Sequence, residues 1–587
     1  MRILLVGLFR SFVPEGGDSP FGSQGGFVDT LAPHPFSLAN ACLKSFALAD
    51  PSIAARHTIE LLDLAEPLEL EDDREEVALT AGDVDRILAF DPDVVGFSGY
   101  CWNVDAIGHA AAALKQRRPG IRIVLGGRAT SGDPEEILAS QPGLDVLVVG
   151  EGELPFREML RLDFEHLEQC PGVVARRGSE IVRGAPPASV QDLDAIPSPY
   201  QLGMVSPALH GMMLELGRGC IHACGYCTWN SDKQLRHFGP SRVEADIRWA
   251  LERGHRHITL NDSAINYDTP TLVRLVEAIR RADPQGSIRF TYNVRHDRIS
   301  PEQLDALSRL PTHMVLCGIE TLLAPGMREV DRDAVDGEAL RKALEQVSAA
   351  TRPPVVSIVL GLPGDTEEGF RHTLETLLSW CEPVEGKPPA AGTVLVSLLQ
   401  VYRGSKLWHR RKELGLRFED RGIPYLIEGG GWTQQALARC KAFLVERMTA
   451  NPDRLKAAEA IALMPARGGM DPWVSPEAVG KLIVPWQVGM THDGWTLEKI
   501  GVMRDTGRGA LLRFRWHQGG GVRVRVTRRN PDRGSRICTR HFDLSPVPLH
   551  GPMPPRQAAS RLMKLVYAAI TRNETSLPHV PGHDPRV

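Results

Sequence analysis

The sequence lacks the features of a membrane, secreted or nucleic-acid-binding protein. No stretch approaches the roughly 18 apolar residues that a membrane helix needs, and the opening run MRILLVGLF lacks the length and cleavage site of a signal peptide. The 10 cysteines are too scattered over 587 residues for a disulfide framework. A net charge of −4 does not indicate the excess of positive charge that is typical of nucleic-acid-binding proteins. We therefore expect a cytoplasmic protein without membrane or nucleic-acid partners.

The length and composition predict a multidomain enzyme-sized chain. The hydrophobic content of 42% and the charged content of 24% are typical of globular proteins. At about 150 residues per domain, the chain accommodates three to four domains. We divide it into a doubly wound α/β domain, a linker, a partial barrel and a C-terminal α+β domain, at 1–165, 166–205, 206–415 and 416–587.

The first domain has the pattern of a parallel sheet with helices on both faces. Short apolar runs alternate with helical patterns at 104–117 and 134–141, and the expected strands are 2–9, 93–100, 121–127 and 145–153. Such sheets bind ligands at the carboxyl ends of their strands. Glycine in those loops lets a bulky ligand approach the backbone closely. The candidate binding residues there are Ser98, Gly99, Tyr100, Trp102, Asn103, Gly126, Gly127, Gly150, Glu151 and Gly152.

The barrel domain repeats a strand and a helix six times. The expected strands are 211–217, 257–262, 288–295, 313–320, 355–361 and 392–402, and the expected helices are 241–253, 269–282, 300–310, 336–349 and 367–380. Ser300, Pro301 and Gln303 form a helix-start signal with a capping box. Six units predict a partial (β/α)6 barrel of the TIM type, with its site at the carboxyl ends of the strands.

A cysteine triplet follows the first barrel strand. Cys220, Cys224 and Cys227 stand in GRGCIHACGYC, a C-x₃-C-x₂-C spacing. Three thiolates bind three irons of a [4Fe–4S] cluster and leave the fourth open, whereas electron-transfer clusters normally have four cysteines. A zinc site is the alternative, but it normally has four ligands, and His222 lies inside the same tight loop. The triplet favours an iron–sulfur cluster.

The triplet resembles that of the radical S-adenosylmethionine (SAM) superfamily, whose cluster cleaves SAM to a 5′-deoxyadenosyl radical. The resemblance implies that Tyr226 packs near the adenine of SAM. It assigns further SAM contacts to residues at strand ends: Asn261, Asp262, Ser263, Glu320 and Gly361. The resemblance leaves two roles open for the Asp262 carboxylate: a hydrogen bond to the amino group of SAM, or contact with the open iron.

Further polar residues end other barrel strands. Arg295 ends the third strand and Tyr402 the sixth, and we predict that both are catalytic because they share the face of the barrel that holds the cluster. Cys317 lies within the fourth strand. A small buried residue is the ordinary expectation there, while a methylation-type cysteine is the alternative.

The loops of the first domain resemble those of cobalamin-binding domains that precede many radical SAM barrels. The resemblance rests on the serine at 98, the paired glycines at 126–127 and the GEGE run at 150–153. The cobalt-ligating D-x-H-x-x-G motif is missing, since the loop 9–26 contains no histidine. We therefore expect cobalamin without a histidine below the cobalt. A flavodoxin-like domain without a nucleotide is the alternative.

Together the two domains resemble the cobalamin-dependent radical SAM methyltransferases, the class B radical SAM methylases. The resemblance implies that SAM charges cobalamin with a methyl group, and that methylcobalamin passes it to carbon of a small aromatic or natural-product substrate, as in antibiotic-pathway members with tryptophan-type or pyrrole-type acceptors. An electron donor such as flavodoxin or ferredoxin is implied as well. The alternatives are a cobalamin-binding cyclase or ring-rearranging enzyme, and a regulatory module with a vestigial barrel.

The C-terminal part has no motif that names a substrate. Residues 432–450 and 559–571 have helical patterns, and 509–517 and 521–529 alternate around a GGG turn as in a hairpin. The alternation places Arg513, Arg515, Arg523 and Arg525 on one face of the hairpin. A solvated face is the ordinary interpretation, and a site for an acidic group is the other. We expect a substrate-specific domain here.

Overall fold

The structure, a computed structural model, describes most of the first 457 residues and five later strands. The described residues are 1–11, 36–67, 81–205, 212–229, 233–334, 336–383, 385–419, 424–451, 454–457, 490–492, 495–505, 508–517, 522–529 and 537–544. The loop expected to lack a cobalt ligand, 9–26, lies outside them from residue 12 on, as do the helix expected at 559–571 and the side chains of the four arginines between 513 and 525.

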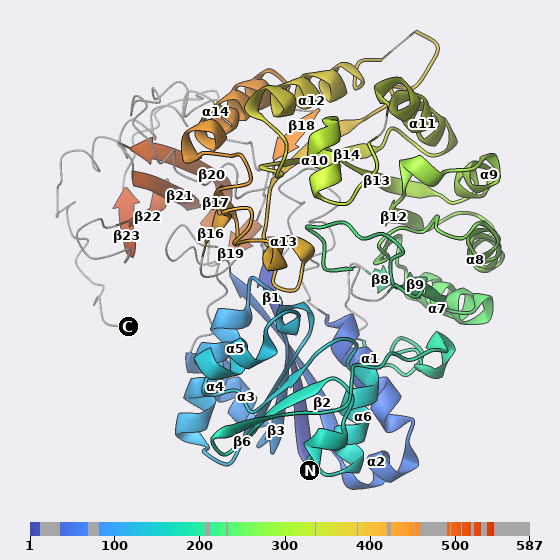
Figure 1. The fold of residues 1–587 in the computed structure, drawn as a ribbon. Helices are drawn as coiled ribbons and strands as arrows, with labels where there is room; N and C mark the ends of the chain where they lie inside the picture. Colours follow the sequence, from blue (N-terminus) through green and yellow to red (C-terminus); the bar gives the residue numbers. More distant parts are fainter. Residues whose placement is uncertain are drawn as a thin grey trace.

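A seven-stranded sheet organises the first part of the chain (Figure 1). Its order is β2 (Thr58–Pro67), β1 (Arg2–Ser11), β3 (Val94–Ser98), β4 (Arg122–Gly126), β5 (Val146–Val148), β6 (Val173–Arg177) and β7 (Glu180–Arg183). The first five are parallel, and β6 and β7 add an antiparallel hairpin at the edge. The hairpin lies within the segment 166–205 that separates the two predicted domains, where the sequence pattern at 171–189 predicts a short hairpin.

Helices cover both faces of this sheet, as the continuous apolar strands predict. Successive residues of β1 point to opposite faces, so Leu4 and Val6 join one core while Ile3 and Leu5 join the other. The first core takes apolar residues from α3 (Ala81–Ala89), α4 (Val104–Arg117) and α5 (Pro134–Ser140). The second core takes them from α1 (Leu38–Leu48), α2 (Pro51–Arg56) and α6 (Glu153–Arg161). The predicted doubly wound arrangement is confirmed.

A second seven-stranded sheet, parallel throughout, forms the partial barrel. Its order is β8 (Met212–Leu214), β11 (His257–Leu260), β12 (Arg289–Asn293), β13 (Thr312–Glu320), β14 (Val355–Leu360), β15 (Thr393–Leu398) and β18 (Leu455–Ala457). The first six are the strands expected from the sequence. The seventh, β18, pairs with β15 and lies after residue 415.

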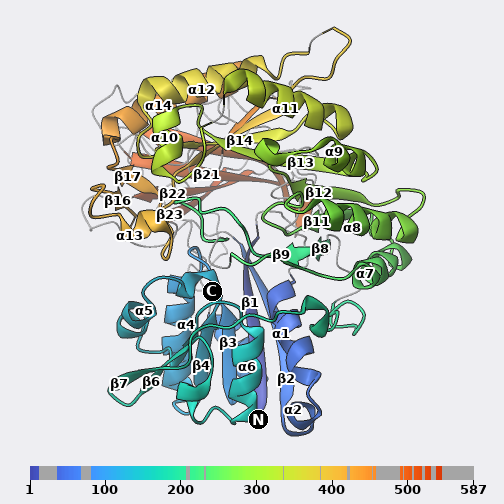
Figure 2. The ribbon, with the colours of Figure 1, turned by 45° about the vertical axis from the view of Figure 1, so that its right-hand side comes forward.

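Helices pack on the outside of this sheet (Figure 2). They are α7 (Pro240–Glu252), α8 (Thr269–Ala282), α9 (Pro301–Ser308), α11 (Gly337–Ala350), α12 (Glu367–Ser379) and α14 (Gln434–Ala450), while the short helices α10 (Ala324–Glu329) and α13 (Lys406–His409) follow β13 and β15. At the start of α9, Ser300 accepts a bond from the backbone of Gln303, whose side chain bonds back to Ser300. The predicted capping box is thus present.

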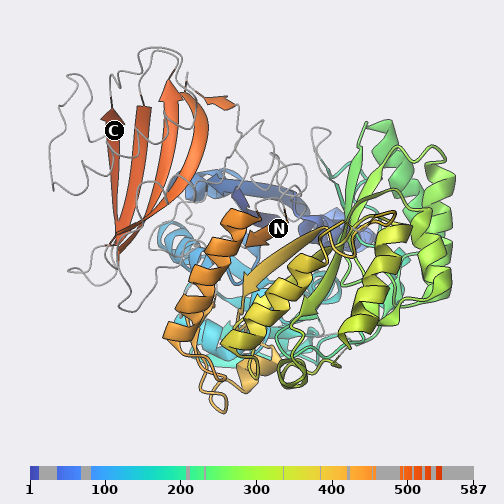
Figure 3. The same cartoon turned by 90° about the horizontal axis from the view of Figure 1, so that it is seen from above.

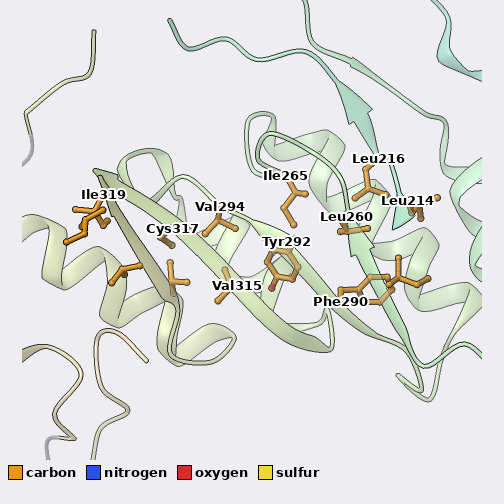
Figure 4. Close-up of a cluster of buried hydrophobic side chains, with 14 of the residues drawn as sticks. Leu214, Leu216, Leu260, Ile265, Phe290, Tyr292, Val294, Val315, Cys317 and Ile319 are labelled. Carbon is orange, nitrogen blue, oxygen red and sulfur yellow. The ribbon is translucent and has the colours of Figure 1, made fainter. Parts of the chain in front are cut away.

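Alternate side chains of the barrel strands point to opposite sides. Figure 4 shows the helix-facing set, in which Tyr292 and Val294 of the β12 region pack beside Val315, Cys317 and Ile319 of β13. Cys317 is fully buried among them. It therefore belongs to the helix-facing core, which agrees with the ordinary expectation for this cysteine.

Five antiparallel strands form a separate sheet near the C-terminus, β19 (Met490–His492), β20 (Trp495–Asp505), β21 (Arg508–His517), β22 (Val522–Arg529) and β23 (Ile537–Leu544). The views agree that it stands on the side of the barrel away from α8 and α9 (Figures 1 and 3). The predicted hairpin is β21 and β22, and its register pairs Arg513 with Arg525 and Arg515 with Arg523. Within the described residues, no helix is long and apolar enough to cross a membrane.

Candidate functional site

The carboxyl ends of strands from both parallel sheets meet at one interface. The loop after β4 reaches the cysteine loop, where the Arg128 guanidinium donates to the Thr228 carbonyl oxygen at 2.6 Å and lies over the Trp229 ring. At a second contact, the Trp408 indole N–H donates to the Asp133 carboxylate at 2.9 Å. The loop after β4 of the first sheet and the cysteine loop of the barrel are therefore in contact across this interface.

The cysteine loop lies between β9 (Gly217–Arg218) and β10 (Arg236–His237), which pair as antiparallel strands. Cys220 and Cys224 are buried and Cys227 is half-buried. The Cys227 backbone N–H donates to the Cys224 carbonyl oxygen at 3.1 Å, and the Trp229 N–H points at the Cys227 sulfur at 3.4 Å. The Tyr267 hydroxyl lies 3.2 Å from the Cys220 sulfur. The cysteine loop thus contains internal hydrogen bonds and also contacts the loop that follows β11.

The three thiols influence one another electrostatically. The pKa of the Cys227 thiol is raised to about 11, chiefly by burial; the Trp229 N–H lowers this pKa, and the charges of Cys224 and Cys220 contribute to the rise. Burial also raises the pKa of Cys224, while Arg332 and Arg295 lower it. Iron binds thiolates, so loading this loop must release protons. Among the described residues, no three His, Cys, Asp or Glu side chains lie close enough to hold a single metal ion.

A buried ion pair stands beside the cysteines. Arg332 donates to the Glu320 carboxylate at 2.6 Å, to the Gly318 carbonyl oxygen at 3.0 Å and to the Tyr226 hydroxyl at 3.3 Å. Arg332 and Glu320 are only 7% and 6% exposed. Glu320 ends β13 with a positive φ of 67°, a strained conformation for a residue with a side chain. The sequence predicted Glu320 and Tyr226 here, but nothing in it pointed to Arg332.

The Asp262 carboxylate accepts hydrogen bonds from the backbone of the segment that leads into the cysteine loop. Its carboxylate oxygens accept from the Leu216 N–H at 3.0 Å and from the Gly217 N–H at 2.7 Å. Burial raises the pKa of this carboxyl to about 8, although the two N–H donors lower it. Neither of the two expected roles of Asp262 uses these bonds. The neighbouring Ser263 hydroxyl donates to the Gly219 carbonyl oxygen at 2.9 Å, and Asn261 is exposed beside it.

Replacing Asp262 by Ala should destabilise the chain more than removing an exposed cap. The change leaves two buried N–H groups without acceptors, each worth about 1–3 kcal/mol. Asp336→Ala is the matched control, because Asp336 caps α11 through one N–H at an exposed position, a loss of roughly 1 kcal/mol. Chemical denaturation should show the larger loss for Asp262→Ala. Equal losses of stability in the two variants would contradict the role of Asp262 in fixing the backbone at Leu216 and Gly217.

The two predicted catalytic residues have local partners. The Arg295 guanidinium pairs with the Asp297 carboxylate, with Nε 2.9 Å from the nearer oxygen, and Arg295 acts on the charge of Cys224. The Tyr402 hydroxyl bonds to the Gln400 side chain. Gly361 has a φ of 99° at the end of β14, next to Leu426 of β17 (Leu426–Glu428). Among Arg295, Tyr402 and Gly361, Arg295 is the residue that lies near the cysteines, because its charge lowers the pKa of Cys224.

The loops of the first sheet contain the predicted polar and glycine residues. Tyr100 and Trp102 stack with ring centroids 4.5 Å apart. The buried Asn103 side chain accepts from the Tyr100 N–H at 2.6 Å and donates to the Ser98 carbonyl oxygen at 3.2 Å, so it holds its own loop. The loops after β3 and β4 lie in contact, since the Gly99 N–H donates to the Gly126 carbonyl oxygen at 2.7 Å.

Replacing Gly127 by Ala should destabilise the first domain. Its φ is 96°, and an added Cβ would lie 2.6 Å from the Gly99 carbonyl oxygen. The left-handed backbone costs about 1–2 kcal/mol and the clash roughly 1–3 kcal/mol. At Gly126 the nearest atom to an added Cβ is 3.8 Å away, so Gly126→Ala is the control. Thermal unfolding should begin at a lower temperature for Gly127→Ala, and unchanged unfolding would contradict the close approach of the loops.

The GEGE run makes ion pairs across the domain interface. Arg218, just before the cysteines, donates to Glu153 at 2.8 Å and to Glu215 at 3.0 Å. Arg236 pairs with Glu151, and one of its guanidinium nitrogens donates to a Glu151 carboxylate oxygen at 3.1 Å. All five side chains are at least four-fifths buried. The sequence placed Glu151 against a cofactor, whereas the structure turns it toward the barrel, and Glu153 begins α6.

Comparison with known proteins gives a match for each parallel sheet. Residues 56–160 match the B12 binding domain family, and residues 214–377 match the radical SAM superfamily. The chain joins a B12-binding domain to a radical SAM domain. The donor sets fit these assignments, because the glycine loops end β3, β4 and β5 while the three thiols share one loop at the barrel end.

Two relatives are methyltransferases by name. The chain is 30% identical over 362 residues to a 2-(S-pantetheinyl)-carbapenam-3-carboxylate methyltransferase of Streptantibioticus cattleyicolor, covering 58% of this chain and 51% of the relative. It is 29% identical over 375 residues to the cobalamin-dependent radical SAM methyltransferase TokK of Streptomyces tokunonensis, covering 59% and 52%. The chain thus spans about half the length of the curated relatives it matches.

A solved structure shares the fold. Radical SAM methyltransferase TsrM of Kitasatospora setae, solved with tryptophan and a SAM analogue, superposes with a TM-score of 0.52 at 15% identity, over 72% of this chain and 79% of that one. The likeness confirms the fold, and the two family matches confirm the predicted order of a B12-binding domain followed by a radical SAM barrel.

Proposed function

We propose that the protein is a cobalamin-dependent radical SAM methyltransferase that moves a methyl group from SAM to carbon of a small natural-product substrate. The observation that carries the proposal is the meeting of the two strand-end sites, where Arg218 beside the cysteines pairs with Glu153 beside the glycine loops. One cofactor on each side of that interface would face the same space. The printed names of both relatives support methyl transfer.

In this proposal, Cys220, Cys224 and Cys227 hold the [4Fe–4S] cluster. When bound, the cluster supplies an electron for cleavage of SAM and cobalamin supplies the methyl carrier. The chain's own residues shape the space around them. Arg332 donates to both the Glu320 carboxylate and the Tyr226 hydroxyl, so both are positioned before SAM arrives. Asn261, Ser263 and Gly361 complete the SAM side.

We assign Asp262 to positioning, because its carboxylate fixes the strand that leads to Cys220. On the cobalamin side, the backbone of Gly99, Gly126, Gly127, Gly150 and Gly152 and the Ser98 hydroxyl lie at the strand ends. The stacked rings of Tyr100 and Trp102 would offer an apolar edge. Asn103 and Glu151 act through the loop and the domain interface that they hold.

We propose a small acceptor rather than a macromolecule, and an external electron donor of the flavodoxin or ferredoxin type. Tryptophan-type, indole and pyrrole acceptors follow from the sequence resemblance, and the carbapenam named for one relative adds bicyclic carboxylates. The tryptophan bound to TsrM supports an aromatic acceptor. The nine cysteines whose side chains the structure describes are free thiols, which suits a reducing compartment such as the cytoplasm.

The test is transfer of a labelled methyl group. Anaerobically reconstituted protein with cobalamin is incubated with trideuteromethyl-SAM, a reductant and a panel of indole, pyrrole and carbapenam carboxylate acceptors. Mass spectrometry should find an acceptor that gains the deuterated methyl group, together with S-adenosylhomocysteine. Formation of 5′-deoxyadenosine without S-adenosylhomocysteine would refute methyl transfer and point to a cyclase or rearranging enzyme.

A further inference from the structure

A tyrosine hydroxyl lies against one of the three cysteine sulfurs. Tyr267 Oη is 3.2 Å from Cys220 Sγ, and Tyr267 comes from the loop between β11 and α8 rather than from the cysteine loop. We propose that Tyr267 donates a hydrogen bond to the Cys220 thiolate and thereby raises the reduction potential of the iron–sulfur cluster. This inference rests on the proposed function, in which Cys220 binds iron.

The loop that carries Tyr267 is fixed on both sides. Before it, the Asn266 side chain accepts from the Arg295 N–H at 2.8 Å and donates to the Arg295 carbonyl oxygen at 2.9 Å. After it, Asp268 caps α8 by accepting from the Thr271 N–H at 2.9 Å. The Tyr267 ring packs against the His222 ring, with centroids 5.5 Å apart. The hydroxyl is therefore held toward the sulfur before any cluster binds.

The chemistry decides which atom donates. A thiolate that binds iron has no proton, whereas a phenol with an ordinary pKa near 10 keeps its proton at neutral pH. Tyr267 must then be the donor. Cys227 receives the Trp229 backbone N–H at 3.4 Å, which no side-chain replacement removes. The bond to Cys220 depends on a single side-chain oxygen, so it can be deleted by itself.

Hydrogen bonds to the sulfurs are among the factors that set cluster potentials. Reduction adds negative charge to the cluster and its thiolates, so a donor stabilises the reduced form more than the oxidised form. Loss of the Tyr267 donor should make the potential more negative. The cluster would then be harder to reduce, although each reduced cluster would be a stronger reductant. Tyr267 is in this sense a positioning and tuning residue, not a catalytic one.

The experiment is a redox titration of the reconstituted full chain, followed by electron paramagnetic resonance of the reduced cluster. Tyr267→Phe should titrate at a more negative midpoint potential than the wild type at equal iron content. Tyr292→Phe is the matched control, because its hydroxyl bonds Thr312 at 2.7 Å inside the helix-facing core. It should titrate with the wild type. An unchanged potential for Tyr267→Phe would overturn the inference.

A second variant covers the case in which Tyr267→Phe does not fold or load iron. Placing 3-fluorotyrosine at position 267 keeps the shape of the ring and strengthens the donor, so the potential should become less negative. No shift, or a shift in the opposite direction, would overturn the inference. Failure of the proposed function is recognised separately: a Cys220→Ala variant that keeps the wild-type cluster spectrum would show that Cys220 does not bind iron at all.

Discussion

Joint replacement of Cys220, Cys224 and Cys227 by alanine is expected to remove all iron and all SAM cleavage. In the proposed function these thiolates are the protein ligands of the cluster, and the cluster supplies the electron for SAM cleavage. The fold should persist, because the cysteine loop is anchored by bonds that the sulfurs do not make, such as Ser263 to Gly219. Iron analysis and visible absorption after anaerobic reconstitution measure the loss.

The control for this prediction is Cys317→Ala. Cys317 is fully buried in the barrel, but it lies in the helix-facing core with Val315 and Ile319. Its replacement creates a small cavity at a modest cost in stability and should leave the iron content and the spectrum unchanged. Full iron binding by the triple variant, or loss of iron in Cys317→Ala, would contradict the assignment of the ligands.

Replacement of Arg218 by Met is expected to produce the largest loss of stability among single substitutions at the domain interface. Arg218 is 12% exposed at its side chain and faces Glu153, Glu215 and Glu151. Without the guanidinium, three largely buried carboxylates would lie together with Arg236 as their remaining cation. Breaking a buried pair by removing one partner costs about 3–5 kcal/mol.

The loss should concentrate at the junction of the two parallel sheets. Limited proteolysis of Arg218→Met should cut between the domains faster than in the wild type, and thermal unfolding should begin at a lower temperature. Arg248→Met is the control, because Arg248 pairs with Glu244 along α7 at a side-chain exposure of 55%. Exposed pairs are worth about 0–1 kcal/mol. Similar stability of the two variants would show that the buried network does not hold the domains together.

Much of the fold could be predicted from the sequence because its signals are local. Continuous apolar runs between helical patterns gave both parallel sheets, and the capping box at Ser300 placed the start of α9. The sequence patterns did not predict the strands β2 and β18. The three-residue β18 is too short to carry a pattern, and it becomes a strand only because β15 offers it a free edge.

The candidate site likewise contains residues that local sequence patterns predicted and side-chain partners that they did not. Cluster chemistry needs three thiolates at close spacing, so the triplet alone named the site, and alternation of strands and helices placed Glu320 at the same end of the barrel. Side-chain partners are a different matter. Tyr267 lies 47 residues from Cys220 and Glu153 lies 65 residues from Arg218. No local rule relates residues so far apart.

What the sequence determined by itself is therefore the pair of parallel sheets, the cysteine triplet and the strand ends at which both sites lie, since each depends on periodicity or spacing along the chain. The tertiary structure alone decided which charged groups meet. It turned Glu151 and Glu153 toward Arg236 and Arg218, gave Asp262 to the backbone of the cysteine strand, and set Arg332 against Glu320. These pairings follow from burial, because a charge withdrawn from water must find a partner in whatever element the fold brings beside it.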